Sequence, residues 1–164
     1  MKTLFLLAIC TFLGVAVFAQ NAAIEPAYKR IPTVPPFNLA LASDSSIFTK
    51  ENLRKKKPLI IMVFSPDCDH CLHATEDLIK NIKLFKNTEI LLASSLSYES
   101  VQKFYRDLNL ASYKNIHVGY DNKRFLNSFF EVRNFPSIFL YDKKGKFMKD
   151  FLDHPDFKNI SSSL

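Results

Sequence analysis

A run of six apolar residues followed by two closely spaced cysteines constrains the fold of this chain more than any other feature of its sequence. Residues 59–64 (LIIMVF) lie between Pro58 and Pro66, and Cys68 and Cys71 follow them. Because the run is short, rich in β-branched side chains and free of polar residues, it predicts a strand that is covered on both faces of a sheet. We therefore expect a buried strand that delivers two cysteines to the turn after it.

The segment after the cysteines has the period of an amphipathic helix. One stripe at steps of three and four contains Cys71, Thr75, Leu78, Ile79, Ile82 and Phe85. This stripe predicts a helix that begins at the cysteines and ends near residues 87–88. Asp67 stands where a helix N-cap is expected, which would place Cys68 in the first turn, close to backbone N–H groups that stabilise a thiolate.

The first 19 residues have the pattern of a secretory signal peptide. Lys2 precedes an uncharged apolar run at residues 4–18, and Ala19 closes a small-residue cleavage site. This run is shorter than the roughly 20 residues that span a bilayer. We therefore predict cleavage, a periplasmic or otherwise exported protein, and no stable membrane insertion afterwards, with an uncleaved membrane anchor as the alternative.

The rest of the chain divides into a linker and one domain. Four prolines within residues 20–36 predict an extended proline-rich linker, and residues 37–164 are long enough to bury a core without a disulfide scaffold. Cys68 and Cys71 are also too close in sequence to close a stabilising loop of useful length. The cysteine pair is therefore more plausibly chemical than structural.

Composition and charge exclude several classes of function. The formal net charge is +6, but the basic residues are scattered apart from residues 54–57 (RKKK), which we interpret as a solvated turn rather than a site for an anionic partner. The chain has no Trp, and its other aromatic residues follow apolar stripes, so no nucleic-acid partner is expected. Three glycines are too few for a phosphate-cradling loop.

Strand and helix patterns alternate along the predicted domain. Hairpins are expected at residues 37–48 and 137–148, strands at 89–93 and 116–120, helices after Ser97 and at 125–130, a short helical turn capped by Thr49, and a polar tail from His154. Strand-helix units joined to terminal hairpins predict a mixed α/β sheet with helices on both faces. The cysteines would then lie at the carboxyl end of a central strand, where open α/β sheets place their sites.

These residues resemble the thioredoxin superfamily, and most closely the exported TlpA/ResA-type thiol-disulfide oxidoreductases. The resemblance covers residues 37–151 and rests on the leading hairpin, the CDHC motif at residues 68–71 that opens a helix, and the NFPS motif at residues 134–137 before a strand. It implies a thioredoxin-like fold in which Pro136 is a cis-proline that faces the disulfide. It also implies that the Phe135 backbone pairs with a substrate peptide.

Several positions depart from the pattern of this superfamily. Asp67 replaces the Trp that often precedes the first cysteine, and Met62 stands where thioredoxin has a buried Asp that assists proton transfer. ResA-like proteins place a Glu three residues after the second cysteine, where this chain has Ala74. Glu76, two residues further on, is the substitute that the sequence offers for this role.

The residues between and beside the cysteines have opposing effects on a thiolate. By the resemblance, His70 occupies the position of a His in the oxidant DsbA, where a nearby positive charge stabilises the thiolate. Asp67 and Asp69 oppose that effect electrostatically. The expected mechanism is attack by the more exposed Cys68 and resolution by Cys71, with protein thiols or disulfides as substrates, a membrane or periplasmic redox partner, and no cofactor.

Three alternatives remain open at the level of the sequence. The first is a non-catalytic binding module with the same fold. The second is a copper or other metal chaperone, because Cys68, His70, Cys71 and His73 lie within six residues, although on a helix His73 would point away from Cys71. The third is a thiol peroxidase, because Ser65 precedes Cys68 by three residues, although the Pro of peroxiredoxins is replaced by Ile61. The favoured hypothesis includes no metal site.

Overall fold

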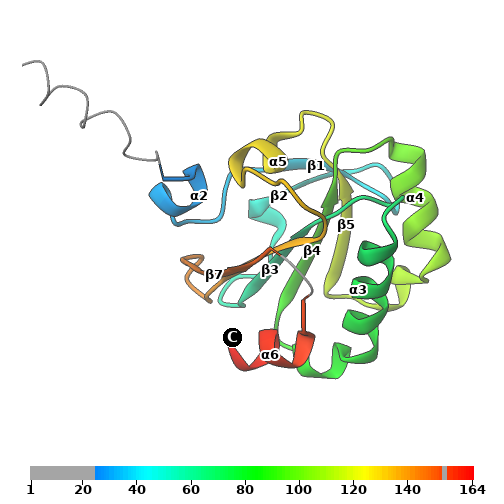
Figure 1. Cartoon of the computed structure of the whole chain (residues 1–164). Helices are drawn as coiled ribbons and strands as arrows, with labels where there is room; N and C mark the ends of the chain where they lie inside the picture. Colours follow the sequence, from blue (N-terminus) through cyan, green and yellow to red (C-terminus); the bar gives the residue numbers. More distant parts are fainter. Residues whose placement is uncertain (1–24, 153–154) are drawn as a thin grey trace, which may run out of the picture.

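A seven-stranded mixed sheet carries the fold, in the strand order β2-β1-β5-β4-β3-β6-β7 (Figure 1). The structure is a computed structural model that describes residues 25–152 and 155–164, so the predicted signal peptide and His154 lie outside it. The predicted central strand is confirmed as β3 (Leu59–Val63), and every residue of it is buried. It is parallel to β4 (Glu89–Ser94) and antiparallel to β6 (Ser137–Tyr141).

The outer strands complete the sheet on both sides of this centre. They are β1 (Asn38–Leu41) and β2 (Ile47–Thr49), which form the predicted N-terminal hairpin, β5 (Ile116–Tyr120), which is parallel to β4, and β7 (Phe147–Phe151), which forms the closing hairpin with β6. A short 3-10 helix, η1 (Lys50–Asn52), follows β2. Thr49 caps it, as its position in the sequence predicted.

Helices cover both faces of the sheet, as predicted. One face packs against α3 (Asp69–Lys80), α4 (Tyr98–Asp107) and α6 (Phe157–Ser162), and the other against α2 (Ala27–Arg30) and α5 (Phe125–Phe129). Successive side chains of β3 alternate between them: Ile60 and Met62 join the core under α3, and Ile61 joins the core under α5. Two apolar layers therefore enclose the strand that leads to the cysteines.

The helix after the cysteines is shorter than its apolar stripe predicted. The α-helix ends at Lys80, and a 3-10 helix, η2 (Ile82–Phe85), continues the chain. The cause is Asn81, whose side-chain amide donates to the backbone oxygen of Asp77 at 2.9 Å and so competes with the helical hydrogen bonds. Phe85 is still fully buried, which explains why the apolar period continues beyond the helix.

The proline-rich segment before β1 is more structured than an extended linker. Tyr28 in α2 is only 4% exposed, and its hydroxyl donates to the Asp150 carboxylate at 2.7 Å. Further along, the backbone N–H of Val34 donates to the oxygen of Gly145 at 3.1 Å. The folded unit therefore includes residues from this segment, ahead of residue 37 where the sequence placed its start.

The expectation of a polar tail was wrong for the last residues. Asp156 caps α6 by accepting hydrogen bonds from the backbone of Lys158 and Asn159, and Phe157 and Ile160 are fully buried in the core under α3. These two apolar side chains are spaced by three residues in a segment rich in serine. The polar composition of this segment therefore led to the wrong prediction, because two buried side chains are enough to make α6 amphipathic.

Gly119 in β5 makes a close contact that yields a stability prediction. A Cβ atom at this position would lie 2.8 Å from Leu39 Cβ, which cannot swing aside because it is fixed to the β1 backbone. Gly119→Ala is therefore expected to lower the free energy of unfolding by about 1–3 kcal/mol. Urea unfolding measures the loss, and Ser112→Ala at an exposed position is the control. An unchanged unfolding midpoint would contradict this packing.

Candidate active site

Cys68 occupies the point where the chain passes from the sheet into α3. Its backbone is extended and it is itself the N-cap residue, and its carbonyl accepts hydrogen bonds from Cys71 N and Leu72 N, both at 3.0 Å. The prediction of Asp67 as the N-cap was therefore wrong. A hydrogen bond of 3.2 Å from Cys68 N to Ser65 O closes the turn before the helix, so the helix is capped by Cys68 and not by Asp67. Asp67 is left exposed within this turn.

The two cysteines differ sharply in their environment. Cys71 is 0% exposed and lies in the core under α3, whereas Cys68 is partly exposed. Burial raises the pKa of the Cys71 thiol to about 12, and the adjacent Cys68 thiol adds to this shift, although the backbone N–H of Ser65, 3.5 Å from Cys71 Sγ, opposes it. Cys68 is therefore the sulfur that a partner can reach, and Cys71 is a protonated thiol held behind it.

A cis peptide bond between Phe135 and Pro136 faces Cys68. It lies in the loop before β6, whose first residue, Ser137, pairs with Val63 at the end of β3. The Cys68 thiol donates to the backbone oxygen of Phe135 at 3.8 Å, within the range of a hydrogen bond to sulfur. The cis-proline that the resemblance implied is thus present and adjoins the exposed cysteine.

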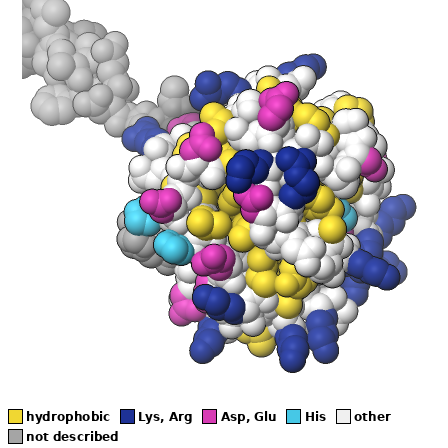
Figure 2. Space-filling view, turned by 90° about the vertical axis from the view of Figure 1, so that its right-hand side faces the viewer, with side chains coloured by type: hydrophobic (Ala, Val, Ile, Leu, Met, Phe, Trp, Pro, Cys, Tyr) yellow, Lys and Arg dark blue, Asp and Glu magenta, His cyan; other side chains and the backbone are white. Residues whose placement is uncertain are grey.

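A groove begins at the cis-proline and continues along α3. It has a volume of about 400 Å³ and is lined by His70, His73, Ala74, Asp77, Phe135, Pro136 and Pro155. Figure 2 shows histidine side chains beside Asp and Glu side chains on the face that α3 and α4 cover. The groove therefore offers an apolar floor, imidazoles and a carboxylate next to the exposed sulfur.

The structure shows no buried carboxylate in contact with the two thiols. Met62 is fully buried in the core under α3. The two buried carboxylates among residues 25–152 and 155–164 are Glu89, which binds Arg54 and His117, and Asp121, which accepts from a backbone N–H of α5. Neither of these two carboxylates is therefore a contact of the Cys71 thiol.

The remaining candidate residues lie at the surface of the helix start. Asp69 is exposed in the first turn of α3, and His70 lines the groove. Glu76, the candidate proton shuttle, has its side chain 41% exposed and lies 3.4 Å from His73 Nδ1. The observed partner of Glu76 is thus a surface imidazole on the same helix. This contact is a surface ion pair and does not involve the thiols.

Two features of the site were not identified from the sequence. The Ser65 backbone N–H approaches the buried sulfur, and Asp77 and Pro155 complete the groove. The spacing of Asp77 from His70 and His73 by seven and four residues places the three on one helical face, and this was the signal available. Nothing in the sequence linked Pro155, more than 80 residues away from Cys71, to the same groove.

The described part of the chain contains neither a cluster of possible metal ligands nor a helix of membrane-spanning length. Within it, no group of three or more His, Cys, Asp and Glu side chains is arranged to hold a metal ion. No helix among the same residues is long and apolar enough to cross a bilayer.

Comparison with solved structures identifies the fold. A candidate thioredoxin from Neisseria meningitidis superposes with a TM-score of 0.65 at 24% identity, covering 80% of this chain and 89% of the other. A secreted disulfide oxidoreductase of Mycobacterium tuberculosis, homologous to E. coli DsbE, gives 0.65 at 16% identity over 78% and 93%. A thiol peroxidase from Chromobacterium violaceum gives 0.65 at 17% identity over 79% and 82%.

The chain therefore has the thioredoxin fold, as the sequence resemblance implied. The similar structures include oxidoreductases that act on disulfides as well as a peroxidase, so the fold alone does not separate these activities. No protein-family model and no curated protein sequence matches this chain.

The difference between the two thiols predicts selective alkylation. In the reduced native protein at pH 7.5, iodoacetamide is expected to modify Cys68 at least about a hundredfold faster than Cys71, because Cys71 is buried and mostly protonated. Below its pKa of about 12, the thiolate fraction of Cys71 grows about tenfold per pH unit, so its modification accelerates in alkali. Mass spectrometry of timed samples measures both rates. Denaturation should abolish the difference, and equal rates in the native protein would contradict it.

Proposed function

We propose that this protein is an exported thiol-disulfide oxidoreductase in which Cys68 and Cys71 exchange a dithiol and a disulfide with protein substrates. The observation that carries the proposal is the partly exposed Cys68 at the start of α3, 3.8 Å from the Phe135 carbonyl beside cis-Pro136, with Cys71 buried behind it. A sulfur in this position is accessible to a second sulfur, and an adjacent thiol can complete the exchange.

In the first step, the Cys68 thiolate attacks one sulfur of a substrate disulfide. A mixed disulfide forms and one substrate thiolate leaves. The exposed Phe135 would offer backbone groups to an extended peptide, and the groove beside Pro136 would offer room for the side chains of that peptide. We further propose that His70, which lines this groove, assists the thiolate chemistry of Cys68.

In the second step, Cys71 attacks the Cys68 sulfur of the mixed disulfide. A Cys68–Cys71 disulfide forms, the second substrate thiolate leaves, and the proton of Cys71 passes to it directly or through water. This route suits a buried thiol with a high pKa, because the departing thiolate is itself the base. The reverse sequence of steps oxidises a substrate dithiol.

The reduction potential of the cysteine pair tests this function. The protein is equilibrated in glutathione buffers, quenched by alkylation and resolved by mass. A potential near the −270 mV of thioredoxin would indicate a reductant supplied by a redox partner, and one near the −120 mV of DsbA would indicate an oxidant. A pair that does not cycle in any buffer would overturn the proposal. Rapid consumption of peroxide would instead favour a thiol peroxidase.

Export rests on the N-terminal pattern of residues 1–19. An oxidising compartment is where a disulfide-exchanging protein of this kind is expected, and a membrane or periplasmic redox partner would recycle the pair. Expression of the full chain with N-terminal sequencing of the exported product tests this part. A mature protein that begins at Gln20 is the expected result, and a full-length product held in the membrane would support the anchored alternative.

A further inference from the structure

A second cavity lies at the end of the sheet opposite the cysteines. Leu59, the first residue of β3, pairs with Glu89 of β4, and both residues line this cavity of about 300 Å³. Cys68 follows the other end of the same strand. A strand of five residues is about 16 Å long, so the cavity is separate from the redox site.

Basic side chains from two regions that are distant in sequence, residues 50–57 and residues 143–144, surround the cavity. They are Lys50 in η1, residues 54–57 before β3, and Lys143 and Lys144 in the turn between β6 and β7. The lining includes two carboxylates, Glu89 and Asp142, so seven basic side chains leave an excess of five positive charges. The basic run interpreted from the sequence as a solvated turn is thus one wall of a larger basic hollow.

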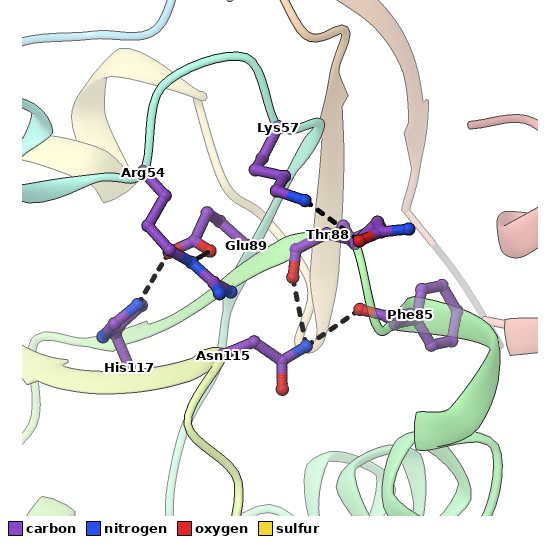
Figure 3. Close-up of polar contacts among 8 residues, drawn as sticks. Arg54, Lys57, Phe85, Thr88, Glu89, Asn115 and His117 are labelled. Atoms are coloured by element: carbon purple, nitrogen blue, oxygen red, sulfur yellow. Dashed lines mark hydrogen bonds and ion pairs between the residues drawn. The ribbon is translucent and has the colours of Figure 1, made fainter.

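Both carboxylates of the cavity are already engaged within the protein. The Glu89 carboxylate accepts from Arg54 Nε on one oxygen and lies 2.9 Å from His117 Nε2 on the other (Figure 3). The Asp142 carboxylate accepts from the backbone N–H of Lys144 at 2.7 Å, and backbone hydrogen bonds in this turn lower its pKa. The Glu89 carboxylate is thus shared between Arg54 and His117, and the Asp142 carboxylate offsets part of the charge of Lys144 in its own turn.

The lysines of the cavity are not held in ion pairs within the described part of the chain. Lys57 Nζ donates to Asn87 Oδ1 at 2.9 Å, which satisfies one donor without neutralising the charge (Figure 3). Among the residues that the structure describes, none of the six lysines around the cavity forms an ion pair. Like charges gathered around one hollow repel each other and create a positive potential that concentrates anions.

We propose that this cavity binds a phosphate group, carried either by a soluble phosphate compound or by a lipid headgroup. Lysine binds phosphate as a point charge and arginine adds a planar donor, and both occur here. Val34 also lines the cavity, so the chain that leads back towards the N-terminus passes beside it. A headgroup held here would orient the cysteines away from the membrane. The site is independent of the thiol chemistry.

The test compares binding by the full chain and two matched double variants. Lys55→Gln with Lys144→Gln removes one charge from each of two walls of the cavity. Lys123→Gln with Lys158→Gln removes two charges at exposed positions elsewhere. Inorganic phosphate and pyrophosphate are titrated calorimetrically, and sedimentation is measured with phosphatidylglycerol and phosphatidylcholine vesicles, the latter giving the background binding of the full chain.

We expect the cavity variant to bind its anion at least about tenfold more weakly than the wild type, and the control variant to bind within about twofold. Binding of free phosphate would identify a soluble ligand, and binding only to phosphatidylglycerol would identify a headgroup. Absence of both, or an equal loss in the two variants, overturns the proposal. If the protein binds polyglutamate but neither phosphate compounds nor phosphatidylglycerol vesicles, the proposal is wrong and the cavity binds an acidic protein partner instead. Glutathione equilibration of the cysteines should be the same in all variants, so failure here leaves the redox function unaffected.

Discussion

Cys68→Ser is expected to abolish the reduction of a protein disulfide, with a residual rate at least about a thousandfold below that of the wild type. The reason is geometric. Cys68 is the partly exposed sulfur beside the Phe135 carbonyl, and Cys71 is 0% exposed and protonated at neutral pH. Without Cys68, no sulfur of the pair can reach a substrate. Insulin reduction in the presence of dithiothreitol measures the effect.

Cys71→Ser is expected to fail differently, because the first step remains possible. The variant should accumulate a mixed disulfide between Cys68 and the substrate, visible as a covalent complex by mass spectrometry under non-reducing conditions. Trapping through Cys71 in the Cys68→Ser protein, or retention of full turnover by either variant, would contradict the assigned order. The pair of variants therefore tests which thiol attacks and which resolves.

Ser65→Ala is the control that separates exchange from peroxidase chemistry. The backbone N–H of Ser65 approaches Cys71 Sγ at 3.5 Å, and this group is retained when the hydroxyl is removed. Disulfide exchange should therefore stay within about twofold of the wild type. A peroxidase that uses the Ser65 hydroxyl would instead lose peroxide turnover while its fold remained intact.

The sequence predicted those parts of the molecule whose pattern is local. Residues 59–64 had no polar position, and they form a strand enclosed by two apolar layers. Ser97 preceded a helical stripe, and its side chain accepts from Ser100 N at the start of α4. The burial of a strand and the capping of a helix depend on residues that are close in sequence. Both features can therefore be predicted from short stretches of the chain.

Features that depend on one particular hydrogen bond, or on distant segments, escaped prediction. The end of α3 at Lys80 depends on an asparagine that competes for a backbone carbonyl, and the N-cap depends on how the turn at Ser65 closes. Likewise, Pro155 joins the groove beside Pro136, and Lys143 joins a cavity with residues 54–57, only because β6 returns beside β3 and β7 beside β6. Which loops meet to form a site is determined by the order of the strands in the sheet. The periodicity of apolar residues within one segment does not predict that order.

Removing a buried side chain of the C-terminal helix α6 is expected to cause a large loss of stability. Phe157 is 0% exposed and meets Phe85 edge-on with a ring-centroid separation of 6.0 Å, so α6 fastens η2 to the core under α3. Phe157→Ala removes a buried aromatic ring and leaves a cavity, and we expect a loss of about 3–5 kcal/mol in the free energy of unfolding. Lys158→Ala, one residue on and exposed, is the matched control, with an expected change within about 0.5 kcal/mol. Chemical denaturation monitored by circular dichroism measures both.

Equal stabilities of the two variants would mean that α6 is a dispensable tail, as its composition suggested. A large loss for Phe157→Ala alone would mean that the last eight residues belong to the domain. The consequence extends to the active site, because Pro155 precedes this helix and lines the groove beside Pro136. Loosening α6 should then weaken substrate binding as well as stability, whereas the intrinsic reactivity of Cys68 towards iodoacetamide should be unchanged. That combination would link a packing residue to the groove without any role in sulfur chemistry.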